Sequence, residues 1–271
     1  MKNLVSAVSL MILLAITACQ KEVKEMNNND PSSAQTPDPS KSSAPGTDKI
    51  LVDASKDGGV WWFPQAPPSF ADSADHQGKY LADYLRSLGY HVDELPRGAV
   101  ITDELLSNYS KIIRGAPFFE YSDGEIAAYK NFMNKRGAIL LFQDHLSYDV
   151  NDKLSEFLGI TFKGAVGGTI TNFADHEITK DVSPLPFIAG AVVMNAENNP
   201  AITVLGSISK TDYTVFNGAD PFNGQAPNVD LPVMGLVTSF PNTKIFFIGD
   251  MNGMESVPQP LTQNVVNWLF K

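Results

Sequence analysis

Residues 137–145 read GAILLFQDH, in which an apolar run ends abruptly in polar side chains. A continuous apolar run of this length is typical of a central strand in a parallel sheet, because helices cover both faces of such a strand. The polar residues 143–145 stand where the strand leaves the sheet. We therefore expect a parallel sheet whose middle strand delivers polar groups to its carboxyl edge.

Strands and amphipathic helices alternate before this strand. Strands are expected at 49–53, 90–95 and 111–114, and helices at 76–88, from Thr102, and from Ser122 to Lys135. The helix at Ser122 begins with Ser-Asp-Gly-Glu, which has the form of a capping box. After the central strand, we expect a helix near 151–158 and a last helix that begins at Ser256 or Gln259.

The second half is less regular. Strand-like runs at 191–194, 201–205, 233–238 and 244–248 have few helices between them, which indicates antiparallel pairing. The expected fold is therefore α/β, with three layers, a mostly parallel sheet, helices on both faces and an antiparallel extension.

The amino terminus has the pattern of an export signal. A basic start, an apolar stretch from Leu4 to Ile16 and the small residues before Cys19 fit a signal peptide. The run Ile16 to Cys19 resembles the lipobox of bacterial lipoproteins, which implies that Cys19 is lipidated and becomes the mature terminus. The alternative is an ordinary signal peptide with an incidental cysteine.

Three regions follow from this interpretation. Residues 1–18 form the signal peptide, residues 19–48 a polar, proline-rich disordered tether, and residues 49–271 the folded domain. Gln20 stands where lipoprotein sorting rules place aspartate for inner-membrane retention, so the resemblance favours the outer membrane. The expected location is the cell envelope, reached through a lipid anchor in the membrane.

The formal net charge of −10 argues against a nucleic-acid partner, because phosphate binding requires clustered lysine and arginine side chains. No nucleotide-binding glycine loop is present.

Several segments, in the order found here, resemble class I glutamine amidotransferase-like domains. They are residues 79–95, 101–109, 122–126 and 137–145, then 176–182, which read HEITKDV, and 246–250 leading into 264–269. The likeness is greatest to the non-catalytic branch that includes gliding-motility transporter auxiliary domains and intraflagellar transport N-terminal domains. It covers nearly all of residues 49–271 and implies an amidotransferase-like, flavodoxin-like fold.

One departure from that superfamily concerns its chemistry. Catalytic amidotransferases carry a cysteine nucleophile on a strained turn after the central strand. Here that strand ends in Gln143, Asp144 and His145, and Cys19 is the only cysteine of the chain. We therefore expect no glutaminase activity and assign no catalytic residue.

Four polar residues are expected at the carboxyl edge, where open α/β sheets bind ligands. Asp53 ends the first strand, Asp144 and His145 follow the central one, and Asp250 follows the last. No cofactor is certain, but carboxylates suit a divalent metal such as Mg²⁺ or Ca²⁺, and the imidazole widens the choice to Zn²⁺ or Mn²⁺. The alternative is that each aspartate caps a helix or binds loop amides.

A second group of candidates surrounds an aromatic run. Asp57, Trp61 and Trp62 could form a stacking platform with polar groups for a sugar, and His76 is expected to face the same edge. The alternatives are that the tryptophans are buried in the core and that His76 caps a helix or faces solvent. For His176, a role in holding its loop is favoured over catalysis. The turn-rich segment 210–230 is either a lid or a solvated loop.

Two functions remain. The first is a lipid-anchored, non-catalytic binding or assembly module of the cell envelope, with a glycan or other polar ligand at the strand ends or an envelope protein as partner. The alternative is a metal-assisted hydrolase of a carbohydrate or related polar substrate that uses Asp144 and His145.

Overall fold

The computed structural model describes residues 48–57, 78–135, 137–144, 152–254 and 259–271. The predictions for the signal peptide, Cys19, the tether, Trp61, Trp62, His76 and His145 lie outside these residues. In the described part of the chain, no helix is both long and apolar enough to cross a membrane.

A single nine-stranded sheet organises the domain, in the order β2-β1-β3-β4-β9-β8-β7-β5-β6. The first five strands in this order are parallel, and β9 to β6 pair antiparallel. This confirms the expected α/β class with an antiparallel extension. The strands are β1 (Lys49–Asp53), β2 (His91–Leu95), β3 (Lys111–Arg114), β4 (Gly137–Phe142), β5 (Phe162–Phe173), β6 (Leu185–Val193), β7 (Ile202–Val215), β8 (Leu231–Val237) and β9 (Thr243–Ile248).

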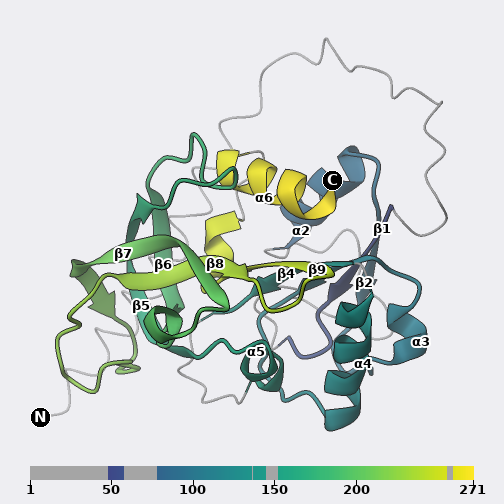
Figure 1. Cartoon of the computed structure of the whole chain (residues 1–271), viewed down its shortest axis with the longest axis horizontal. Coiled ribbons are helices and arrows are strands. Elements are labelled where there is room, and N and C mark those ends of the chain that lie inside the picture. Colours follow the sequence, from purple (N-terminus) through teal and green to yellow (C-terminus); the bar gives the residue numbers. More distant parts are fainter. Residues whose placement is uncertain (1–47, 58–77, 136, 145–151, 255–258) are drawn as a thin grey trace, which may run out of the picture. The chain divides into compact units, whose positions relative to one another are not determined.

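Helices cover both faces of the parallel strands (Figure 1). α2 (Lys79–Ser87) and α6 (Pro260–Phe270) pack on one face, and α3 (Asp103–Leu106), α4 (Asp123–Asn134) and α5 (Lys153–Phe157) on the other. Two short 3-10 turns, η1 (Ala196–Asn198) and η2 (Met251–Met254), complete the described elements.

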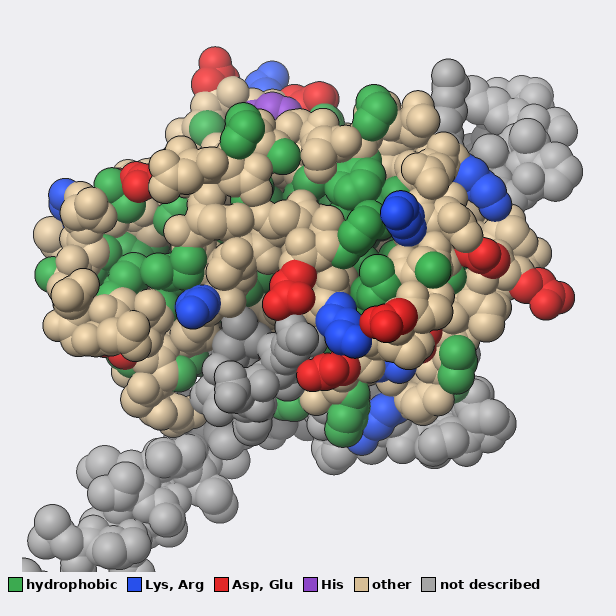
Figure 2. All heavy atoms as spheres, turned by 60° about the horizontal axis from the view of Figure 1, so that its bottom comes forward, with side chains coloured by type: hydrophobic (Ala, Val, Ile, Leu, Met, Phe, Trp, Pro, Cys, Tyr) green, Lys and Arg blue, Asp and Glu red, His purple; other side chains and the backbone are tan. Residues whose placement is uncertain are grey.

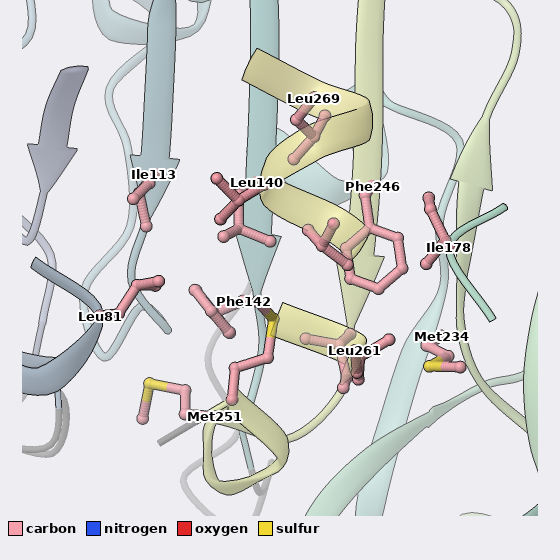
Figure 3. Close-up of a cluster of buried hydrophobic side chains, with 14 of the residues drawn as sticks. Leu81, Ile113, Leu140, Phe142, Ile178, Met234, Phe246, Met251, Leu261 and Leu269 are labelled. Atoms are coloured by element: carbon pink, nitrogen blue, oxygen red, sulfur yellow. The ribbon is translucent and has the colours of Figure 1, made fainter. Parts of the chain in front are cut away.

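The central strand explains why both faces need cover. Leu140 and Phe142 of β4 point into the core beneath α6, as Figure 3 shows, whereas Ile139 and Leu141 point into the core beneath α4. All four side chains are fully buried. The uninterrupted apolar run predicted from the sequence is thus required by a strand between two hydrophobic layers.

Local sequence signals set the helix starts. Ser122 and Glu125 form the predicted capping box of α4, in which each side chain bonds the other's backbone N–H. The Thr102 hydroxyl caps α3 by accepting a bond from the Leu105 N–H. Gln259, one of the two predicted starts, is the N-cap residue of α6.

The antiparallel half departs most from expectation. β5 was not predicted, and β6 and β7 are longer than the runs that predicted them. β6, the outermost strand, returns to the end of β9, where the Ala191 N–H donates to the Gly249 carbonyl oxygen over 2.8 Å. The antiparallel half therefore closes back on the parallel half.

The Asp250 side chain holds β6 against the end of β9. Its two carboxylate oxygens accept bonds from the Ile188 N–H of β6 and from the Asn252 N–H of η2. The side chain is fully buried. We call this arrangement of Asp250, Ile188, Ala191 and Gly249 the β6 clasp.

Candidate functional site

A polar layer lies at the carboxyl edge of the parallel strands, on the face covered by α4 and α5. Asp53 and Arg114 end neighbouring strands and are register partners there. Gln143 follows β4, the next strand in the sheet. All three side chains are buried although they are polar, so each requires partners inside the protein.

The partners of Asp53 come from the α4 segment and from its own loop. One carboxylate oxygen accepts bonds from the Tyr121 hydroxyl at 2.8 Å and the Tyr129 hydroxyl at 2.5 Å. The other oxygen accepts the Ser55 N–H at 2.9 Å. The carboxylate of Asp53 is therefore anchored by three internal donors.

Burial and the contacts with Asp53 keep the hydroxyl groups of both tyrosines protonated. Burial raises the pKa of the Tyr121 hydroxyl well above its ordinary value of 10.0, and the Asp53 carboxylate adds to this rise while Arg114 opposes it. Burial and Asp53 likewise raise the pKa of Tyr129 well above 10.0. Both phenols thus remain protonated donors to Asp53 at neutral pH.

Arg114 connects the sheet to α5. Its Nη2 donates to Asp152 at 2.8 Å and to the Ser155 hydroxyl at 3.2 Å. Asp152 is the N-cap residue of α5 and also accepts the Ser155 hydroxyl and the Gln143 amide, the latter at 3.1 Å. One carboxylate therefore joins β3, the end of β4 and α5.

The guanidinium of Arg114 is only partly satisfied. Its Nε and Nη1 atoms are buried and have no hydrogen-bond partner among the described residues. Unpaired buried donors are costly, so their cost must be offset by the pairing of Nη2 and the packing around the side chain.

A pocket of about 660 Å³ adjoins this polar layer, and Gln143 and Asp152 are part of its lining. We define the strand-end pocket by residues 143, 152, 155, 156, 160–164, 219–221 and 223. The polar side chains of this lining include those of Gln143, Asp152, Ser155, Lys163, Asp220 and Asn223. Residues 219–221 and 223 of the lining belong to the turn-rich segment 210–230, for which the sequence allowed either a lid or a solvated loop.

The loop that carries Asp220 is internally braced. The Asp220 carboxylate accepts the N–H groups of Phe222 and Gly224. Ala165 donates its N–H to the Ala219 carbonyl, and Phe216 donates to the Ala165 carbonyl. These bonds join the loop to β5 and hold its polar groups beside the pocket.

The predicted ligand-binding residues that the structure describes are not among those that line the strand-end pocket. Asp53 lies in the polar layer, Asp250 in the β6 clasp, and neither lines the strand-end pocket. Asp57, in the loop after β1, and Asp144, just after β4, are both buried. The Asp57 carbonyl accepts a bond from Arg97 Nε, and the Asp144 N–H donates to the Gln143 side chain. Ligand binding by the predicted set remains a prediction.

No group of three or more histidine, cysteine, aspartate or glutamate side chains is placed to hold a metal ion among the residues that the structure describes. His176 uses its Nδ1 atom to accept the Ile178 N–H at 3.1 Å, and its ring meets the edge of Trp268. Its observed contacts are those of a loop-holding residue.

Sequence reasoning missed most of the pocket. Asp152 carries a local signal, since an aspartate immediately before a helical run is a common N-cap residue. Lys163, Asp220 and Asn223 carry none, because only the pairing of β5 with β7 brings their segments beside α5.

Comparisons with solved structures establish the fold. The mmIFT52 N-terminal domain aligns with a TM-score of 0.57 and 18% identity, over 82% of this chain and 95% of that domain. A putative ThuA-like protein from Bacteroides uniformis aligns with a TM-score of 0.50 and 18% identity, over 86% of this chain and 95% of that one. No family model matches the sequence, and no curated protein sequence matches it. The chain is thus structurally similar to class I glutamine amidotransferase-like folds.

Proposed function

We propose that this protein is a lipid-anchored, non-catalytic binding or assembly module of the bacterial cell envelope, attached to the outer membrane. In this proposal a polar ligand such as a glycan occupies the strand-end pocket. An envelope protein is the other partner class that the proposal admits.

The observation that carries the proposal concerns the position after β4. Catalytic amidotransferases have a cysteine nucleophile there, whereas this chain has the hydrogen-bonded Gln143. Gln143 is buried and donates its amide to Asp152, and Cys19, the only cysteine, lies in the amino-terminal segment. The edge therefore offers hydrogen-bonding groups without the thiol that glutaminase chemistry requires.

The polar character of the pocket supports binding of a polar ligand. Carboxylate, amide and ammonium groups line the pocket, and one of the carboxylates, Asp152, is held by its ion pair with Arg114. Groups held in place before binding lose little conformational freedom when a ligand arrives. A ligand rich in hydroxyl groups would match such a surface.

Lipid attachment is tested on the full chain expressed in a Gram-negative bacterium that is fed an alkyne fatty acid. The wild-type protein is expected to incorporate the label and to fractionate with the outer membrane, and Cys19→Ala is expected to lose the label. Ser9→Ala, which alters the same segment but keeps the cysteine, is the matched control. Label retained in Cys19→Ala would remove the anchor from the proposal.

A second measurement distinguishes this proposal from the alternative function, a metal-assisted hydrolase that uses Asp144 and His145. Elemental analysis of the purified, dialysed protein is expected to find no stoichiometric divalent metal. A stoichiometric metal that is lost in Asp144→Asn and His145→Ala would favour the hydrolase instead.

A further inference from the structure

We infer that the strand-end pocket selects polyhydroxylated ligands that carry no acidic group, an inference that rests on the proposed function. The argument concerns the charges that a ligand meets in the pocket and the groups that hold those charges.

Carboxylates outnumber cations among the described residues that line this pocket. Within that set, Asp152, Glu156 and Asp220 are acidic and Lys163 is basic. An incoming carboxylate or sulfate therefore meets more repulsion than attraction. Hydroxyl groups can donate hydrogen bonds to the same oxygens, so a neutral sugar meets no such penalty.

The buried arginine does not reverse this balance. Arg114 is fully buried, does not line the pocket, and pairs with Asp152 over 2.8 Å. Its charge is matched by that carboxylate, while the Asp53 carboxylate lies in the same polar layer. The buried Arg114 and its neighbouring carboxylates thus add no net positive charge beside the pocket.

The two remaining carboxylates differ in their freedom. Asp220 is tied to the amides of its own loop, so its charge stays beside the pocket. Glu156 is an exposed side chain on α5. Glu156 is therefore the better position at which to remove charge without disturbing the fold.

The face of the molecule shown in Figure 2 has no large patch of one charge that could select ligands in place of the pocket. Acidic and basic side chains are interspersed there rather than gathered into a basic patch. Selection by charge is therefore assigned to the pocket lining, where partial desolvation strengthens electrostatic effects.

The test uses the full-length chain in detergent on an immobilised set of neutral oligosaccharides, each paired with an acidic oligosaccharide of the same length. We expect the neutral members to bind, with at least about tenfold preference over their acidic partners at low salt. Glu156→Gln should narrow this preference severalfold. Glu104→Gln, the same change at an exposed site on α3, should leave it unchanged.

A blocking variant locates the binding. Thr161 is exposed and lines the pocket, so Thr161→Trp should abolish binding, whereas Thr203→Trp on the exposed side of β7 should not. Circular dichroism and thermal melting must show that both variants are folded.

The outcomes separate the two claims. Preference for acidic members overturns the inference and leaves the proposed binding function intact. Neutral binding that survives Thr161→Trp also overturns the inference, because the ligand then occupies another place. Absence of binding by every member overturns the proposed glycan-binding function and the inference with it.

Discussion

Asp53 and Arg114 are register partners at the ends of β1 and β3, yet each charged group is held by a different helical segment. Asp53 accepts the hydroxyls of Tyr121 and Tyr129 from the α4 segment, and Arg114 donates to Asp152 and Ser155 at α5. The two helices are therefore docked on the sheet through polar contacts as well as through the apolar core.

Removal of the Arg114 partner should be strongly destabilising. Asp152→Ala leaves a buried guanidinium without its carboxylate and takes away the N-cap of α5, so we expect a loss of about 3–5 kcal/mol in the free energy of unfolding. Urea denaturation measures this loss. Lys153→Ala, which breaks the exposed neighbouring pair with Asp123, is the control and should leave the midpoint nearly unchanged. Equal effects of the two changes would contradict the buried-pair argument.

Tyr121→Phe should destabilise the protein and reduce its sensitivity to alkali. The change removes a bond to the buried Asp53 carboxylate and should cost about 1.5–3 kcal/mol. Because the folded-state pKa of Tyr121 is raised above 10.0, its contribution is fully present below that value and is lost as the pH rises beyond it. Urea midpoints at roughly pH 8 and pH 11 should therefore differ less in Tyr121→Phe than in wild type. An unchanged difference would argue against this role.

Glu125 should contribute to acid sensitivity. Burial alone would raise the pKa of Glu125, but bonds from the Ser122 backbone, Lys56 and the Ile101 backbone lower it below its ordinary 4.5. The stabilisation is then present above about pH 4.5 and is lost as the pH falls through the lowered pKa. Glu125→Gln can keep the capping box but not the charge, so its stability should fall less steeply on acidification.

Acid denaturation followed by circular dichroism checks this expectation. Glu104→Gln, at an exposed position of α3, should retain the wild-type acid profile. A wild-type acid profile in Glu125→Gln would show that protonation of Glu125, and loss of its ion pair with Lys56, does not cause the acid sensitivity.

Gly249→Ala should be severely destabilising because the backbones of β6 and β9 meet at this position. A methyl group on Gly249 would collide with the Ala191 carbonyl oxygen, which is backbone and cannot turn away. Gly124 offers the matched control, since a methyl group there meets nothing closer than 3.9 Å in the first turn of α4. Gly124→Ala should be neutral or stabilising by about 0.5 kcal/mol. Thermal melting of both variants makes the comparison.

The parallel half could be predicted because its signals are local. The apolar run of β4 and the Ser122–Glu125 capping box each identify an element from adjacent residues. β5 gave no such signal, because Gly164, Gly167 and Gly168 weaken its strand propensity and register shifts break its alternation.

The candidate site was predictable only in its location. Polar residues after apolar strands correctly indicated a polar carboxyl edge, since Asp53 and Gln143 lie there. The pocket also needs segments that the antiparallel half folds back to this edge, such as residues 219–223. That proximity depends on the strand order beyond β9, which no local pattern specifies.

The β6 clasp also bears on aggregation. An open strand edge presents unpaired backbone groups to which another chain can add a strand. At β6 the N–H groups of Ile188 and Ala191 are already bonded to Asp250 and Gly249. The opposite edge, β2, carries the charged and partly exposed side chain of Asp93. Each edge of the sheet thus has its own barrier against the addition of another chain: at β6 the Asp250 carboxylate and the Gly249 carbonyl group, and at β2 a charged side chain.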